Sequence, residues 1–151
     1  MNACGTGVEW FFKLFGAKAT IADVVKALHR KKRSDWEGWL LSRNNLPLIK
    51  ALLANGADVH ANNDWALRYA ALYGYLDVVK FLVANGADVH AYDDWALRNA
   101  ACYGCLAIVK FLVANGADVH ANNDEALRNA AYNGYLNVVK FLKSEMEKKG
   151  R

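Results

Sequence analysis

Cys102 and Cys105 are separated by two residues, a spacing that can form a redox pair or half of a zinc site. No second pair of Cys or His residues lies at a matching spacing, and Leu72 and Tyr75 occupy the same places 30 residues earlier. Cys4 makes the total of three cysteines odd, whereas disulfide scaffolds use even sets. The sequence therefore favours reduced thiols and predicts neither metal binding nor redox chemistry.

Three histidines, His60, His90 and His120, recur at intervals of 30 residues and could suggest a metal ladder. In stacked repeats they would lie too far apart to share one ion. No repeated Ser or Cys nucleophile has a base that the register would bring near it, and no glycine-rich phosphate loop occurs. We expect no enzyme activity, no cofactor and no metal.

The charge is uneven along the chain, with +5 over residues 1–33, −3 over 34–142 and +2 over 143–151. His29 to Arg33 form the sharpest basic run, which can act as a nuclear-import or phosphate patch. Cations at the end of a helix also stabilise its dipole, and this second interpretation is favoured. Because the array lacks a Lys/Arg stripe along its recognition face, nucleic-acid binding is not expected.

The aromatic segment from Trp10 to Phe15 could lie in a membrane interface, or could form the apolar side of an amino-terminal helix that docks on Trp36 and Trp39. The second interpretation is favoured. No apolar run approaches the roughly 18 residues that a membrane span needs, and no basic segment of a secretory signal precedes Val8. Membrane association is not expected, and a cytoplasmic location is predicted.

The sequence contains a 30-residue repeat, and this repeat sets the positions of the cysteines and histidines of the array. The phrase Asn-Gly-Ala-Asp-Val-His-Ala begins at Asn55, Asn85 and Asn115, and residues 64–93 and 94–123 match at 23 of 30 positions. A fixed period of this length indicates a solenoid whose units bury their apolar faces against their neighbours.

Each unit has the pattern of two helices. Asp64 is predicted to cap the first helix, with its carboxylate accepting from N–H groups of the first turn, and Arg68 is predicted to pair with it four residues later. Ala66, Leu67, Ala70 and Ala71 have the spacing of one buried side, Gly74 is expected to end the helix, and the second helix is predicted over Leu76 to Ala84. The polar link to the next Asp is expected to be a turn.

The string Ala-Leu-Arg-x-Ala-Ala-x-x-Gly-x-Leu-x-Val-Val-Lys-Phe-Leu-Val-Ala-Asn-Gly-Ala-Asp-Val-His-Ala resembles the ankyrin repeat, specifically from Leu46 to Leu142. The resemblance implies an all-α ankyrin-repeat solenoid of stacked helix-turn-helix units with β-turn fingers. The usual Thr-Pro-Leu-His opening is absent, and the period is 30 instead of 33, so shortened fingers are expected. This short form resembles repeats common in ankyrin proteins of large DNA viruses.

The register divides the chain into three regions. Residues 1–33 are predicted to be an amino-terminal helical cap and residues 143–151 a polar carboxy-terminal cap tail. Between them, residues 34–142 form the array, with units 34–63, 64–93, 94–123 and 124–142.

Comparison of the units within the chain separates positions fixed by stacking from those that vary. In the ankyrin family the variable side of the first helix lines a concave groove together with the finger tips, which implies a partner-binding site. The predicted partner-binding residues are Trp65, Tyr69, Tyr73, Tyr92, Trp95, Asn99, Tyr103, Glu125, Asn129 and Asn133. The alternative for Trp65 and Trp95 is that they only pack along the stack.

We therefore expect a non-enzymatic, monomeric module that binds a protein or peptide through this side. Two alternatives stay open: a stable repeat scaffold without a specific ligand, and a peripheral membrane or nucleic-acid adaptor that uses the basic amino-terminal third.

Overall fold

The computed structural model describes residues 46–54 and 58–149. Within these residues the chain forms helices and no strand. The predicted amino-terminal cap, its basic run and its aromatic segment lie outside the described residues. The described helices are α4 (Leu46–Ala54), α5 (Ala61–Leu72), α6 (Leu76–Ala84), α7 (Ala91–Cys102), α8 (Leu106–Ala114), α9 (Ala121–Tyr132) and α10 (Leu136–Lys149).

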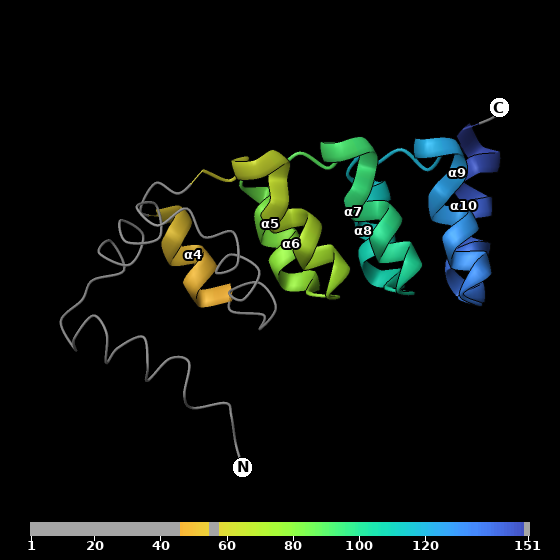
Figure 1. Ribbon diagram of the computed structural model, residues 1–151, viewed down its shortest axis with the longest axis horizontal. Helices are drawn as coiled ribbons and strands as arrows, with labels where there is room; N and C mark the ends of the chain where they lie inside the picture. Colours follow the sequence, from red (N-terminus) through yellow and green to blue (C-terminus); the bar gives the residue numbers. More distant parts are fainter. Residues whose placement is uncertain (1–45, 55–57, 150–151) are drawn as a thin grey trace, which may run out of the picture.

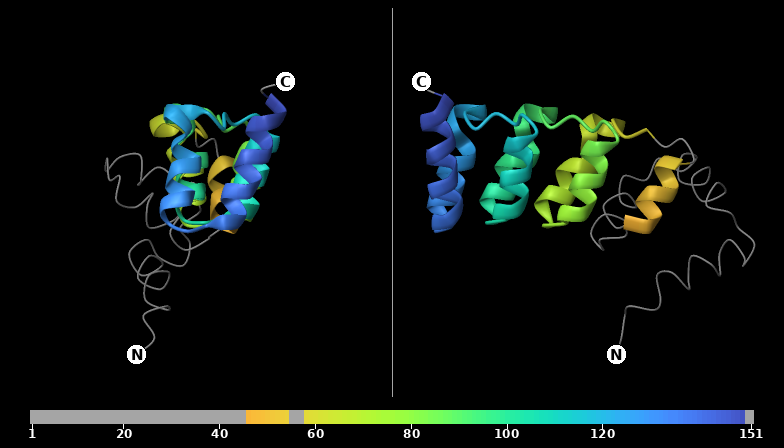
Figure 2. Two further views of the ribbon diagram at one scale, coloured as in Figure 1. Left: turned by 90° about the vertical axis from the view of Figure 1, so that its right-hand side faces the viewer. Right: turned by 180° about the vertical axis from the view of Figure 1, so that it is seen from behind.

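The helices form two parallel columns (Figure 1). We call α5, α7 and α9 the first helices and α4, α6, α8 and α10 the second helices. An end-on view shows the first helices superposed in one column and α8 and α10 in the other (Figure 2). The most extensive contacts between units join α5 to α7 and α7 to α9. The described part of the chain is an all-α repeat solenoid, as expected.

The first helices stack through small and branched apolar side chains. Leu67, Ala70 and Ala71 of α5 are fully buried, and Leu97 of α7 repeats the position of Leu67. Leu127, their counterpart in α9, is only half-buried, since α9 belongs to the last described unit. Alanines at the contact allow the helix axes to approach closely. The predicted buried side of α5 is confirmed at Leu67, Ala70 and Ala71, whereas Ala66 is only partly buried.

The second helices bury a different apolar set against the first column. In α6 the fully buried residues are Val78, Val79 and Leu82, and α8 repeats them. The bounds of α6 coincide with the predicted Leu76 to Ala84. Pro47 lies in the first turn of α4, where its missing N–H is tolerated.

A glycine ends each first helix. Gly74 has φ = 78°, and the N–H of Tyr75 donates to the carbonyl of Ala70 (2.9 Å), while the N–H of Gly74 donates to Ala71 (3.3 Å). This pair of bonds satisfies the last carbonyls of the helix and requires a left-handed residue at the glycine position. The prediction that glycine ends the helix is confirmed.

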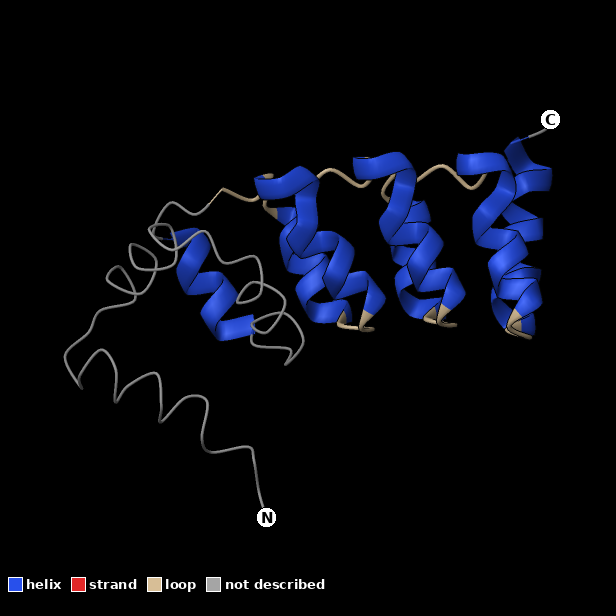
Figure 3. Cartoon of the chain, viewed as in Figure 1, coloured by secondary structure: helices blue, strands red, loops and turns tan. Residues whose placement is uncertain are grey.

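The finger is a single left-handed turn that joins directly onto the first helix after it, so a structural unit is counted from its finger: residues 58–84, 88–114 and 118–149. Asn62, Asn63 and Asp64 have φ between 52° and 56° and ψ between 39° and 59°, and the two later units repeat this geometry. Asn and Asp tolerate this region better than other non-glycine residues because their short polar side chains bond locally. The three positions with positive φ turn the chain into the right-handed helix, and Figure 3 draws this turn as the start of each first helix.

The carboxylate of Asp64 joins two units. Its Oδ1 accepts a hydrogen bond from the backbone N–H of Asp88 in the next unit (2.8 Å) and lies 3.2 Å from Nδ1 of His60. Asp94 accepts in the same way from Asp118 (2.8 Å). The prediction that Asp64 caps its own helix by accepting from N–H groups of the first turn is wrong. Because Asp64 itself has positive φ, its carboxylate is directed to the following unit.

The predicted Arg68 to Asp64 pair is also wrong. Arg68 Nε donates to the carbonyl of Asn63 (3.0 Å) and its Nη2 to the carbonyl of Asn62 (3.1 Å). The left-handed turn aims these carbonyls at the guanidinium, whose planar fork suits two acceptors. Arg98 and Arg128 bind the carbonyls of their own fingers in the same way.

The last described helix is longer than its counterparts. α10 continues to Lys149 without the glycine turn that ends α6 and α8, and Lys148 pairs with Glu145 (2.6 Å). Met146 packs partly against the core. The polar segment that follows Leu142 is therefore helical as far as Lys149.

The positive φ of Asn63 in the finger leads to a prediction about stability. The Asn63 side chain is exposed, so Asn63→Ala acts through the backbone and should lower the free energy of unfolding by about 1 kcal/mol. Asn63→Gly should remain close to the parent chain because glycine adopts positive φ freely. Chemical denaturation of both variants is the measurement, and equal losses for Ala and Gly would contradict it.

A second prediction compares two glycines with similar φ, Gly104 (70°) and Gly134 (78°). A Cβ on Gly104 would lie 2.8 Å from Cγ of Tyr135, whereas a Cβ on Gly134 would meet nothing within 4 Å. Gly134→Ala should cost about 1 kcal/mol of backbone strain, and Gly104→Ala at least about 1 kcal/mol more. Thermal unfolding checks the ranking. Adding Tyr135→Ala should remove most of the excess.

Candidate functional site

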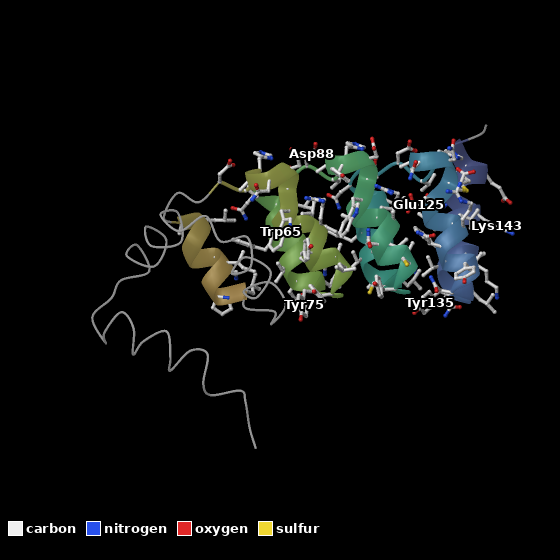
Figure 4. All side chains as sticks on the ribbon, viewed as in Figure 1. Trp65, Tyr75, Asp88, Glu125, Tyr135 and Lys143 are labelled. Atoms are coloured by element: carbon white, nitrogen blue, oxygen red, sulfur yellow. The ribbon has the colours of Figure 1, made fainter. Side chains whose placement is uncertain are left out.

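The variable residues lie on the first helices and their fingers. Tyr73 and Tyr103 directly follow α5 and α7 and have 48% and 56% of their surface exposed, and Tyr92 of the second finger is 61% exposed. Asn133 is also exposed, whereas the other predicted site residues are partly buried. Figure 4 shows Asp88 at the finger edge and Tyr75 and Tyr135 at the opposite edge, with Trp65 and Glu125 between these edges.

Aromatic rings connect the first two described units. The ring centroids of Trp65 and Tyr69 lie 4.1 Å apart, and Tyr69 in turn lies 5.9 Å from Trp95 of the next unit and 6.1 Å from Tyr73. The two tryptophans therefore flank Tyr69 instead of packing on each other. These rings stabilise the stack, because aromatic pairs contribute beyond their buried area. They also form a continuous aromatic surface across the two units.

Arg68 lies between two aromatic rings. Its guanidinium carbon is 5.0 Å from the ring centroid of Tyr92 and 5.3 Å from that of Trp95, while its N–H groups hold the finger carbonyls. Cation–π contacts of this kind favour a fixed guanidinium. One side chain thus fixes the finger of its own unit and the aromatic residues of the next.

In the next pair of units an acidic residue replaces the tryptophan. Arg98 Nη1 lies 2.5 Å from Glu125 Oε2, and Asn129 Nδ2 donates to Glu125 Oε1 (3.2 Å). Burial alone would raise the pKa of Glu125, but hydrogen bonds from Asn122, Arg98 and Asn129 and the charge of Arg98 outweigh it and lower the pKa below its ordinary value. Glu125 is therefore held as a carboxylate beneath the finger.

The asparagines of the site bond mainly within the array. Asn99 Nδ2 donates to the carbonyl of Trp95 (3.1 Å), and Asn133 Nδ2 donates to the carbonyls of Asn129 (3.0 Å) and Cys102 (3.2 Å). Asn133 thus joins α9 to α7 at the edge where the first helices end. These amides order the surface and leave the tyrosines as its most exposed large side chains.

The structure therefore brings Trp65, Tyr69, Trp95 and Tyr73 into one aromatic row, while Glu125 and the asparagines form a polar continuation. Sequence reasoning missed Arg68 and Arg98, which it paired with aspartates of their own units. It also missed Tyr75, whose ring stacks 6.1 Å from Tyr73. The variation of Tyr75, Cys105 and Tyr135 between units was the signal that could have found this position.

The chemistry suggested by Cys and His residues has a structural explanation. His60 and His90 lie against Asp64 and Asp94, at 3.2 and 3.1 Å. Cys105 is half-buried against the preceding unit, and burial raises the pKa of its thiol. In the described part of the chain, no three His, Cys, Asp or Glu residues group in a way that could hold a metal ion.

Comparison with known families agrees with this architecture. A family model described as ankyrin repeats (3 copies) matches residues 16–93, and one described as ankyrin repeats (many copies) matches residues 94–142. The first match alone covers more than half of the 151 residues. The chain belongs to the ankyrin-repeat family. A search of curated proteins finds no match to it.

Ankyrin repeats in general are protein–protein interaction modules and are typically non-enzymatic. The first family match begins at residue 16, inside the segment assigned above to an amino-terminal cap. The absent Thr-Pro-Leu-His opening has a local replacement, since Arg98 binds the carbonyls of Tyr92 and Asp93 at 2.9 and 2.8 Å. Across the described residues, no helix has the length and apolarity needed to cross a membrane.

The lowered pKa of Glu125 predicts a pH-dependent contribution to stability. A carboxylate whose pKa is lower in the folded state stabilises the protein above its unfolded pKa, about 4.3, and loses this effect as pH falls through the folded pKa. Near pH 7 the free energy of unfolding of the parent chain should be about 1 kcal/mol higher than that of Glu125→Gln, and this difference should shrink below pH about 4. Denaturant unfolding at several pH values measures it. Glu147→Gln, on the exposed end of α10, is the control, and a difference that grows in acid would contradict the assignment.

Proposed function

We propose that this ankyrin-repeat protein binds a protein or peptide through the variable side of its first helices. The exposed tyrosines Tyr73, Tyr92 and Tyr103 carry this proposal, because they occupy that side without being enclosed by the stack. Tyrosine supplies a large and stiff contact area and is enriched among residues that dominate binding energy. The variation between units supports the same side, since stacking does not fix these positions.

The tryptophans have a second role in this proposal. Trp65 and Trp95 hold Tyr69 between them and Trp95 also supports Arg68, so they position the surface. This arrangement favours the packing interpretation for the tryptophans. The binding energy is then assigned first to the tyrosines and to the finger residues beside them.

We further infer that the array is of the short-finger type that the sequence resembles in large DNA viruses. The 30-residue period and the single left-handed turn in each finger support this assignment. A non-enzymatic, monomeric protein in the cytoplasm remains the prediction from sequence. The proposed partner is a protein, not a nucleic acid or a membrane.

The proposal predicts a loss of binding when Tyr73 and Tyr103 are truncated together. Tyr73→Ala with Tyr103→Ala should reduce capture of the partner from lysate by about tenfold or more, because each residue is expected to contribute on the order of 1 to 2 kcal/mol. Affinity capture with quantitative mass spectrometry is the measurement, and thermal unfolding of the same variant verifies that the array remains folded.

Leu136→Ala is the matched control, since Leu136 is 66% exposed and begins α10, in the column of second helices. It should capture the partner as the parent chain does. Unchanged capture by the double variant, with unfolding like that of the parent, would remove Tyr73 and Tyr103 from the site.

A further inference from the structure

We propose that the segment recognised by this surface is cationic, a lysine- or arginine-rich stretch of the partner protein. This inference rests on the proposed function and adds the charge class of the partner. Its basis is a separation of charge across the two helix columns that the sequence order conceals.

The two columns carry opposite formal charges. Residues 58–72, 88–102 and 118–132, which hold the fingers and first helices, contain eight acidic and three basic side chains, or −5. The second helices α4, α6, α8 and α10 contain seven lysines and three acidic residues, or +4. Because the helices alternate along the chain, the mild net charge of the array is the sum of two opposing faces.

Several carboxylates of the acidic column reach solvent at the finger edge. Asp58, Asp88 and Asp93 are exposed, and Asp118 and Asp124 are partly exposed. Among the described residues, the Asp93 carboxylate has no hydrogen-bond partner, although its carbonyl accepts from Arg98. Asp58, Asp88 and Asp118 recur with the repeat, and with Asp93 and Asp124 they present a row of negative charge to a ligand that lies along the fingers.

All three arginines of this column make contacts within the array. Arg98 is 8% exposed and binds Glu125 and two carbonyls, and Arg68 lies against Tyr92 and Trp95. Arg128 also binds finger carbonyls but remains exposed at the last described unit. Glu125 neutralises Arg98, whereas Arg68 keeps its charge, so one positive charge opposes the exposed Asp58, Asp88 and Asp93 over the first two fingers.

The exposed aromatic side chains suit the same ligand class. Tyr92 and Asp93 are consecutive, so a phenol ring and a carboxylate stand together on one finger. The ring face attracts cations through its quadrupole, and Arg68 already uses one face of Tyr92 in this way. Tyr73 and Tyr103 present further rings at the other end of the first helices.

The basic second helices make this recognition directional. Lys80 and Lys110 are exposed on α6 and α8 and would repel a cationic segment. Charge complementarity of this kind steers association and fixes orientation more than it adds affinity. A cationic segment is thus directed to the fingers and the tyrosines, while an acidic one would be directed to the opposite column.

The experiment measures fluorescence anisotropy of labelled peptides with the full chain. One peptide alternates arginine and glycine, and the other alternates glutamate and glycine. The arginine peptide should bind, and raising the salt from about 0.05 M to about 0.5 M should weaken its affinity by about tenfold or more. Failure of the arginine peptide to bind at low salt, or equal binding of the glutamate peptide, would overturn the inference.

Variants locate the binding. Asp93→Asn introduces the residue that the other two fingers carry at this position, Asn63 and Asn123, so the finger should keep its geometry. It should weaken binding of the arginine peptide by about threefold to fivefold. Lys80→Gln, on the opposite column, should not weaken it. A loss of equal size in both variants would contradict the proposed surface.

The two proposals can fail separately. If the variant with both Tyr73→Ala and Tyr103→Ala loses its partner while the arginine peptide does not bind, the binding side stands and the cationic class is wrong. If the arginine peptide binds through Asp93 while the same variant keeps its partner, the cationic site stands and the tyrosines are excluded.

Discussion

The hydrogen bond from one unit's backbone to the preceding unit's aspartate is the interaction on which the arrangement depends. Asp64 and Asp94 are nearly buried, and each accepts from an N–H group one unit further along. A buried carboxylate without a donor would be costly, so each finger must place its amide at a fixed point. The histidine beside each aspartate completes the site, and apolar stacking of the helices then follows in one register.

This constraint explains the unusual backbone of the fingers. Three consecutive residues with positive φ orient Asp64 toward the next unit and aim two carbonyls at Arg68. The strain of these conformations is offset by the bonds they allow, and Asn and Asp reduce it. The arginines extend this constraint to the surface, because Arg68 contacts the rings of Tyr92 and Trp95 and Arg98 binds the carboxylate of Glu125. The scaffold and the surface thus share the same side chains.

The opposite charges of the two helix columns have a simple physical origin. The second helices bury their apolar residues and expose lysines, whereas the first helices and fingers use carboxylates for bonds between units. The carboxylates that join units, Asp64 and Asp94, are buried, whereas the exposed Asp58 and Asp88 accept from N–H groups of their own fingers. Exposed tyrosines lie on the same column. The acidic part of this face is thus partly a consequence of how each finger is built.

The sequence by itself determined the period, the helix pairs, the glycine ends and the buried alanines and leucines, because these depend on local periodicity and backbone preference. Only the tertiary structure decided the partners of Asp64 and Arg68, since both bind across a left-handed turn that no propensity indicates. The same holds for Tyr69 between Trp65 and Trp95 and for Arg98 with Glu125. The contacts between units join residues 24 to 27 positions apart, and their geometry exists only after neighbouring units have stacked.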